Sequence, residues 1–255
     1  MKVLIIGGNG SMGPHVVNAL CPWHELRVTD VNSAPPGFCH EYRQLDTGDL
    51  DGVVEAADGM DAIINLSVSR TDRRGAFDVN LRGCYNAAVA AVRHGIRTIV
   101  NTGPYYQVAG PSYDDFDFGL HPDMPPQPGT QLYAITKALG HEVLRVFSEQ
   151  HDLYVQTLLF YLMRHPTALR SFDMNEIGGV GMDMSPPYII AWPDTGLAVR
   201  AALEVECKRL PSHCETYFVL PTIPHSKYRN DKLERVLGWE PPHRLEHLWL
   251  RRIDP

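Results

Sequence analysis

The sequence predicts an α/β fold with a doubly wound parallel sheet, and three observations lead to that prediction. Apolar runs such as Val3 to Ile6 are continuous rather than alternating, as strands buried on both faces require. Such runs alternate with helical patterns in the order β-α-β-β-α-β up to about residue 66. The connections between them are short, so neighbouring strands are expected to run in the same direction with helices on both faces.

The first strand leads into the glycine-rich turn Gly7-Gly8-Asn9-Gly10-Ser11-Met12-Gly13 and then into a helix. Gly7, Gly10 and Gly13 recur at every third position, so the backbone can turn sharply and approach a pyrophosphate without a Cβ in the way. The helix that follows offers unpaired N–H groups to the phosphates. The order predicts a Rossmann dinucleotide site built by Gly7, Asn9, Gly10, Ser11, Met12 and Gly13, with a purely structural turn as the alternative.

The second predicted strand, Glu25 to Asp30, ends in an acid that lies seventeen residues beyond Gly13. A dinucleotide fold places a carboxylate there, where it accepts hydrogen bonds from the adenosine ribose. No Arg or Lys within residues 31–37 would neutralise a 2′-phosphate, so NAD is favoured over NADP, and a strand-end turn acid is the alternative. Asp46 and the pair Leu66-Ser67 follow later strands and are predicted at the same edge.

Later elements continue the alternation, with long helices over 75–94 and 132–150, each followed by a strand. Beyond residue 160 the pattern becomes irregular before a helix near 194–204 and a short strand follow. We therefore expect a nucleotide-binding Rossmann domain over 1–160. Residues 161–255 are expected to form a small C-terminal substrate-binding lobe that is interleaved with it.

Acid–base chemistry is predicted at the start of the helix over 132–150. Tyr133 and Lys137 are four positions apart, so they project from one face of that helix. An ammonium beside a phenol stabilises the phenolate, and a pKa lowered by about three units from ~10 would make Tyr133 a usable acid/base near neutral pH. Tyr228 and Lys232 repeat the spacing, but the first pair follows the fifth strand, where the nicotinamide would lie.

Composition argues against several classes of partner. The 255 residues carry a net charge of −7 without a basic run, which argues against nucleic acid and anionic membranes. No run reaches the ~18 apolar residues of a membrane span, and no leader precedes the first strand, so a cytoplasmic protein is expected. The cysteines lack CxxC spacing, and His243 and His247 have no third ligand nearby. Reduced thiols, solvated surface histidines and no metal site are expected.

The glycine turn, Asp30, Asp46, Asn80 within Val79-Asn80-Leu81-Arg82-Gly83, and Tyr133-x-x-x-Lys137 occur in this order. Together they resemble the extended short-chain dehydrogenases/reductases of the NAD-dependent epimerase/dehydratase family, over nearly the whole chain. The resemblance implies NAD as the cofactor, Asn80 in its site, Tyr133 as the catalytic acid/base and Lys137 on the nicotinamide ribose. It also implies a Ser or Thr after the fifth strand that holds the substrate oxygen, for which Thr102 is the candidate.

Departures from the family narrow the expected reaction. Gly103-Pro104 follow Thr102 where dehydratases carry Asp-Glu, which argues against dehydration. Only 118 residues follow Lys137, which favours a substrate smaller than a nucleotide sugar. The layout is most similar to the uronate dehydrogenases, which oxidise the anomeric hydroxyl of a free sugar acid. Phe160 stands where those enzymes carry a carboxylate-binding arginine, so Arg164 or Arg170 is the expected replacement.

We therefore predict an NAD-dependent oxidoreductase that oxidises a hydroxyl of a sugar or sugar acid, or reduces the matching carbonyl. Its catalytic residues would be Tyr133, Lys137 and Thr102. Its substrate contacts would be Ser69, Tyr105, Arg164 and Arg170. A nucleotide-sugar epimerase that retains NAD through its cycle and a non-catalytic NAD-binding sensor are the alternatives. The resemblance also implies a homodimer through helices 75–94 and 132–150.

Overall fold

The computed structural model describes residues 1–70, 72–116, 119–165, 188–222 and 226–243. Its strands are β1 (Lys2–Ile6), β2 (Glu25–Asp30), β3 (Glu41–Gln44), β4 (Ala62–Asn65), β5 (Thr98–Pro104), β6 (Tyr154–Phe160), β7 (Leu162–Arg164), β8 (Ile189–Ala191) and β9 (Cys214–Val219). Its α-helices are α1 (Gly13–Leu20), α2 (Leu50–Ala57), α3 (Arg73–Ala76), α4 (Gly83–His94), α5 (Leu132–Gln150), α6 (Trp192–Glu204) and α7 (Asp231–Leu237).

The main sheet has seven strands in the order β3-β2-β1-β4-β5-β6-β9, and every pair in it is parallel. β7 and β8 form a separate two-stranded sheet. The order runs outward from β1 in both directions, so the doubly wound Rossmann fold predicted from the sequence is confirmed. Ile6 pairs with Thr29 on one side and with Asn65 on the other. The carboxyl ends of β1, β2 and β4 therefore meet where the strand order reverses, which is where such sheets bind ligands.

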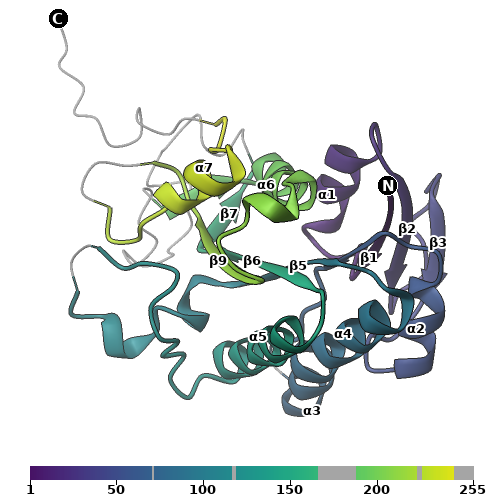
Figure 1. The fold of residues 1–255 in the computed structure, drawn as a ribbon, viewed down its shortest axis with the longest axis horizontal. Coiled ribbons are helices and arrows are strands. Elements are labelled where there is room, and N and C mark those ends of the chain that lie inside the picture. Colours follow the sequence, from purple (N-terminus) through teal and green to yellow (C-terminus); the bar gives the residue numbers. More distant parts are fainter. Residues whose placement is uncertain (71, 117–118, 166–187, 223–225, 244–255) are drawn as a thin grey trace, which may run out of the picture.

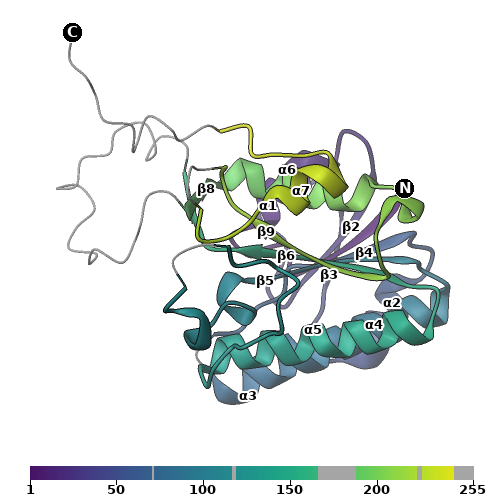
Figure 2. The same cartoon turned by 60° about the vertical axis from the view of Figure 1, so that its left-hand side comes forward.

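Helices cover both faces of this sheet, as Figures 1 and 2 show from two directions. α1, α6 and α7 lie on one face, and α2, α4 and α5 lie on the other. The strand β1 contributes to both layers, because Val3 and Ile5 join the first core while Leu4 and Ile6 join the second. Burial of each such side chain stabilises the fold by about 1.5–3 kcal/mol. This two-sided burial is why the first apolar run does not alternate.

The predicted helix over 75–94 is present but is divided. It consists of α3, a π-helical segment over Phe77–Arg82, and α4. Asn80 lies inside the π-helical segment and is fully buried. Gly95 ends α4 in the left-handed conformation, with φ of 67°, which a glycine adopts without steric cost. Single turns of π-helix are frequent at functional sites, and here one surrounds a residue that the sequence singled out.

Residues after 160 contribute to the main sheet as well as to their own small sheet. β9 pairs with β6 along its length, and α6 packs against α1. Gly196 makes that helix contact close, because a Cβ there would lie 2.1 Å from the carbonyl oxygen of His15. The division into a domain over 1–160 and a substrate lobe over 161–255 stays a prediction.

The expectations drawn from composition can be compared with the described residues. Among them, no helix combines the length and the apolar character needed to cross a bilayer. The five cysteines are free. The His243 side chain is 41 % exposed, as a surface histidine is expected to be, but its Nδ1 also lies 2.5 Å from Oδ1 of the fully buried Asp194. Burial raises the pKa of Asp194, and the contact with His243 opposes that rise. His247 lies outside the described residues.

Candidate active site

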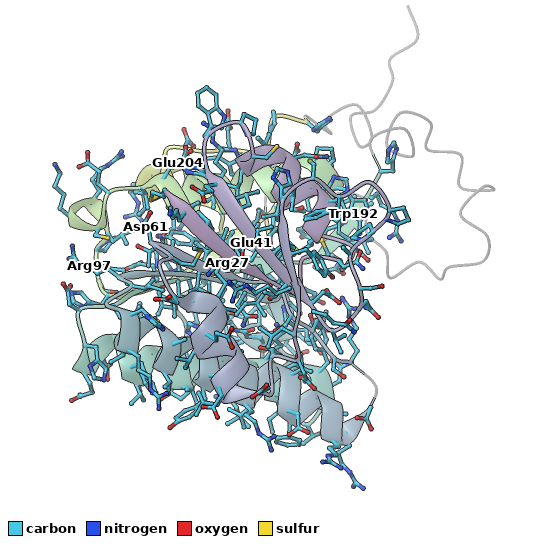
Figure 3. All side chains as sticks on the ribbon, turned by 90° about the vertical axis from the view of Figure 1, so that its right-hand side faces the viewer. Arg27, Glu41, Asp61, Arg97, Trp192 and Glu204 are labelled. Atoms are coloured by element: carbon cyan, nitrogen blue, oxygen red, sulfur yellow. The ribbon has the colours of Figure 1, made fainter. Side chains whose placement is uncertain are left out.

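Two adjoining cavities lie along the carboxyl edge of the main sheet. Their volumes are about 270 Å³ and about 460 Å³, and Gly7, Gly10, Leu66 and Val68 line both of them. Figure 3 shows which end of the molecule carries the cavities, because Trp192, which lines the larger cavity, lies at one end. Asp61 and Arg97, which precede β4 and β5, lie at the opposite end. The two cavities form a continuous cleft over the glycine turn.

At two positions of the glycine turn, a side chain would clash with neighbouring backbone. Gly7 has φ of +80°, and a Cβ there would lie 2.7 Å from the backbone nitrogen of Ser67. A Cβ at Gly13 would lie 1.8 Å from the carbonyl oxygen of Gly8. The turn therefore lies directly on the residue after β4, and α1 begins close against the turn. Gly7 and Gly10 form the floor shared by the cavities, while Ser11 and Met12 line the larger one.

The smaller cavity carries the two predicted acids. Asp30 and Asp46 line it, and no Lys or Arg is among its described lining residues. The backbone N–H of Asn9 donates to Oδ2 of Asp30 at 3.0 Å. The N–H and the side-chain amide of Asn32 both donate to Oδ1 at 3.0 Å. Since a carboxylate offers about four acceptor sites, Asp30 keeps one for a ribose hydroxyl, and a grip by both oxygens requires the Asn32 amide to move.

The predicted cofactor residues beyond β4 are held by buried side chains. Leu66 lines both cavities and Ser67 lines the smaller one, and the Ser67 hydroxyl donates to Oδ1 of Asn65 at 2.6 Å. Asn80 is not among the lining residues. Its amide donates to the Ser69 carbonyl at 2.7 Å and to Oγ1 of Thr136 at 2.9 Å, while its oxygen accepts from the Ser69 N–H. Asn80 therefore connects the loop after β4 to α5, and it holds Ser69 through the backbone N–H and carbonyl of that residue.

Lys137 lies at the base of the larger cavity. Its side chain is 2 % exposed, and Nζ donates to the carbonyl oxygens of Ser67 at 2.8 Å and Thr102 at 3.0 Å. Burial lowers the pKa of Lys137 to about 8, with a smaller contribution from the charge of Arg70. The ammonium is thus fixed by backbone carbonyls that follow β4 and lie in β5, in the cavity that Tyr133 and the glycine turn also line.

Tyr133 lines the same cavity, but the predicted lowering of its pKa is wrong for this structure. Burial raises the pKa of the phenol above its ordinary value. The cation that opposes this rise is Arg70, through its charge and a hydrogen bond, and not Lys137. The guanidinium carbon of Arg70 lies 5.3 Å from the centre of the Tyr133 ring. Lys137 is directed instead toward the backbone carbonyls, so it does not reach the phenol in this arrangement.

The hydroxyl groups after β5 differ in part from those predicted. Thr102 lines the larger cavity, but its hydroxyl donates to the Asn65 carbonyl at 3.1 Å, so its proton is engaged. Tyr105 is not among the lining residues, because its ring stacks on Tyr161 with 4.3 Å between centres. Tyr106 lines the cavity in its place, with its ring 5.9 Å from that of Tyr133. Burial raises the pKa of Tyr106 to about 12, so it remains a neutral hydroxyl.

The remaining predicted substrate residues are divided between described and undescribed parts of the chain. Arg164, at the end of β7, lines the larger cavity together with Phe160. Arg170 lies outside the described residues. Arg70 and Tyr106 were missed by the sequence analysis. The adjacent tyrosines after β5 were a signal for Tyr106, but which of them faces the cavity depends on the short 3₁₀ turn over Tyr105–Gln107. Nothing in the spacing of Arg70 distinguished it from Arg73 or Arg74.

A protein-family model matches most of the chain that forms this fold. The model of NAD-dependent epimerases and dehydratases matches residues 3–163, which is more than half of the chain. The chain belongs to the NAD-dependent epimerase/dehydratase family. The resemblance seen in the sequence is thereby confirmed, and NAD is the cofactor that the family uses. A search of curated proteins finds no match.

Solved structures similar to this family member share its fold. A glucuronic acid dehydrogenase from Chromohalobacter salexigens superimposes with a TM-score of 0.77 at 19 % identity, covering 100 % of this chain and 91 % of its own. A uronate dehydrogenase from Agrobacterium tumefaciens gives 0.73 at 21 % identity, with 100 % and 91 % covered. A UDP-galactose 4-epimerase gives 0.73 at 17 % identity, with 96 % and 95 % covered.

The residues present fit the cofactor of the family. The close approach at Gly7 leaves the backbone bare where a pyrophosphate passes, and the N-terminus of α1 follows directly. Asp30 and Asp46 border the cavity on one side of the turn, where hydroxyl and amino donors of the adenosine half would be accepted. Ser67 and Lys137 connect this half to the larger cavity. The smaller cavity therefore fits the adenosine half of NAD.

Proposed function

We propose that this protein is an NAD-dependent oxidoreductase that oxidises a hydroxyl group of a sugar or sugar acid, or reduces the matching carbonyl. The observation that supports this most is the convergence of Tyr133, Lys137 and the glycine turn on one cavity of about 460 Å³. A tyrosine that can exchange a proton and a site for a hydride acceptor then lie within reach of one small molecule.

Each residue has a distinct task in this proposal. The Tyr133 phenol exchanges the proton of the substrate hydroxyl, and NAD, when bound, supplies the acceptor for the hydride. Lys137 keeps its ammonium on the carbonyls of Ser67 and Thr102, where it faces the ribose of the cofactor. Tyr106 stays protonated because its pKa is raised to about 12, so it donates a hydrogen bond to the substrate. Thr102 takes part in holding the reacting oxygen if its proton leaves the Asn65 carbonyl.

Dehydration is the family reaction that the cavity supports least. Gly103 and Pro104 form the end of β5 and line the cavity at the position of the acid pair that dehydratases use. No Asp or Glu is among the described residues that line this cavity. Elimination of water requires an acid to protonate the leaving hydroxyl, and these side chains offer none beyond the tyrosines.

The direct test is the absorbance of NADH at 340 nm after purified protein is mixed with NAD. The panel contains free uronic acids, their parent aldoses and sugar nucleotides. Accumulation of NADH with one class identifies a dehydrogenase and its substrate class. The absence of NADH with every class, in protein that binds NAD, contradicts the proposal and favours the non-catalytic NAD-binding sensor or an epimerase.

The epimerase alternative is favoured by the similarity to a UDP-galactose 4-epimerase fold. Such an enzyme returns the hydride to the sugar, so it interconverts two nucleotide sugars without net NADH. We would incubate the protein with each nucleotide sugar and separate the products by chromatography. A second sugar nucleotide formed in the absence of NADH would replace the dehydrogenase proposal with this one.

We also propose that the protein forms a homodimer through α4 and α5. Both helices lie side by side on one face of the sheet (Figure 2), and exposed apolar side chains gather on them and on the adjoining π-helical segment. These side chains are Phe77, Tyr85, Val92, Leu139 and Val146. Solution mass from light scattering tests this, with Leu139→Glu combined with Val146→Glu as the disrupting variant. A monomeric mass for the unchanged protein contradicts the homodimer.

A further inference from the structure

The larger cavity has a charge that is opposite to that of the protein as a whole. Arg70, Lys137 and Arg164 line it, and no Asp or Glu is among its described lining residues. The complete chain, by contrast, has a net charge of −7. Because none of the described residues that line this cavity carries a negative charge, the cations that converge on it attract an anion more strongly than the same groups would when they are dispersed over a surface.

The three cations are not equivalent. Lys137 already donates to two backbone carbonyls and is almost fully buried. Arg70 lies on the loop between β4 and α3, and its guanidinium contacts the Tyr133 ring. Among the described residues, Asp78 is paired with Arg74 and Arg82, and Arg70 has no carboxylate partner. Arg70 is therefore a cation at the mouth of the cavity whose planar donor group has no anion to bind within the described protein.

We propose that Arg70 determines substrate specificity by binding an anionic group, a carboxylate, on the molecule whose hydroxyl meets Tyr133. This rests on the proposed function, because it names the substrate class of the same cavity. A guanidinium presents donors in a fork that matches the two oxygens of a carboxylate, and such pairs are about twice as strong as neutral hydrogen bonds. Its position beside the phenol places the carboxylate next to the reacting centre.

Binding of the carboxylate also changes the contacts of Tyr133. Arg70 rests on the Tyr133 ring, and Tyr106 packs edge-on against the same ring. A carboxylate draws the guanidinium toward itself, so the phenol is released to meet the substrate hydroxyl. A neutral sugar has no carboxylate to attract the guanidinium, so Arg70 stays on the Tyr133 ring. The acid and its neutral parent are therefore distinguished by Arg70 and not by Tyr133.

The test compares hexuronic acids with their parent aldoses, for example glucuronate with glucose, in protein saturated with NAD. Binding is measured by calorimetry and turnover by NADH absorbance. Arg70→Gln is expected to weaken the binding of the acid and raise its KM by about 10- to 100-fold, with little change for the aldose. Arg70→Lys retains the charge without the fork, and recovers part of the loss. Arg74→Gln is the matched control, because Arg74 is exposed and pairs with Asp78.

Each outcome supports or overturns the proposal. An equal loss of kcat for acid and aldose in Arg70→Gln, with KM unchanged, overturns it and leaves Arg70 as a group that acts on the phenol alone. Failure of the unchanged protein to bind any of the acids also overturns it. Acids that bind in an Arg70-dependent way without turnover support it while contradicting the dehydrogenase proposal. Turnover of aldoses but not of acids overturns the proposal for Arg70 and supports the dehydrogenase proposal.

Discussion

The two halves of the cleft share a glycine floor but differ in charge. The smaller cavity is bordered by Asp30 and Asp46, with no cation among its described lining residues. The larger cavity has Arg70, Lys137 and Arg164 and no acid among its own. An acidic wall accepts hydrogen bonds from hydroxyl and amino groups, whereas a cationic wall binds anions. The two ends of the cleft share the backbone of the glycine turn, and the charges of the side chains around it give them different ligand preferences.

The halves also differ in how their charges are supported. Asp30 accepts three hydrogen bonds from Asn9 and Asn32, so it is positioned before any ligand arrives. In the larger cavity, Lys137 is also held by hydrogen bonds, which it donates to the carbonyl oxygens of Ser67 and Thr102, but burial lowers its pKa to about 8. Such a lowered pKa means that the ammonium is less stable in the folded protein than in water. Asp30 is thus positioned for a ligand, while Lys137 is a charge made less stable by burial, which an anion bound in the same cavity would stabilise.

The largest effect is expected from the acid/base residue of the cationic half. Tyr133→Phe removes the hydroxyl that exchanges the proton, so kcat is expected to fall by about 10³-fold, while the affinity for NAD is retained. Steady-state kinetics and NAD titration measure the two quantities. Tyr228→Phe is the control, since Tyr228 and Lys232 have the same spacing but Tyr228 lies outside the cleft. Turnover that survives in Tyr133→Phe contradicts the assignment.

A smaller effect is expected in the acidic half. Asp30→Asn removes a charge-assisted acceptor for the ribose, so the Kd for NAD is expected to rise by about 10- to 100-fold. Loss of the negative charge also narrows the preference for NAD over NADP. Calorimetric titration with both cofactors measures the effect, with Asp51→Asn on the exposed start of α2 as the control. An unchanged NAD affinity would show that the acid has only a structural role.

The buried charge of Lys137 predicts a dependence of stability on pH. The folded protein releases this proton near pH 8, whereas the unfolded chain holds it to about pH 10.4. Between these values the unfolded state binds more protons, so the free energy of unfolding rises with pH. Relative to Lys137→Met, the unchanged protein should gain about 2 kcal/mol from pH 7.5 to 9.5 in urea unfolding. Replacement of the exposed Lys208 by Met is the control. If the free energy of unfolding changes equally with pH in all three proteins, the lowered pKa of Lys137 is refuted.

The smallest effect is expected from the neighbouring tyrosines. Tyr106→Phe should lower kcat/KM by about fivefold, as the loss of one neutral hydrogen bond of about 1 kcal/mol implies. Tyr105→Phe should leave it unchanged, because that ring stacks on Tyr161 and is not among the residues that line the cleft. Kinetics of the two variants on the same substrate measure this. A larger loss in Tyr105→Phe would restore the original prediction for that residue.

Much of the fold could be predicted because it depends on local patterns. Continuous apolar runs identified β1 and β4, and the glycine spacing identified the turn that approaches Ser67. The division of the helix over 75–94 could not be predicted in this way. It accompanies the hydrogen bonds that Asn80 makes to Ser69 and Thr136, which are distant in the sequence. A hydrogen bond between separate elements leaves no periodic signal.

By itself, the sequence determined the doubly wound class of the sheet, the glycine turn after β1, the acid at the end of β2 and the Tyr133-Lys137 spacing. These follow from the periods of strands and helices and from the freedom of glycine, all of which are local properties. The tertiary structure decided the partners of these residues. It placed Lys137 on two backbone carbonyls, Arg70 on the Tyr133 ring, and Tyr106 rather than Tyr105 in the cleft. The direction of a loop side chain depends on which neighbours pack around it, and those neighbours come from strands and helices far along the chain.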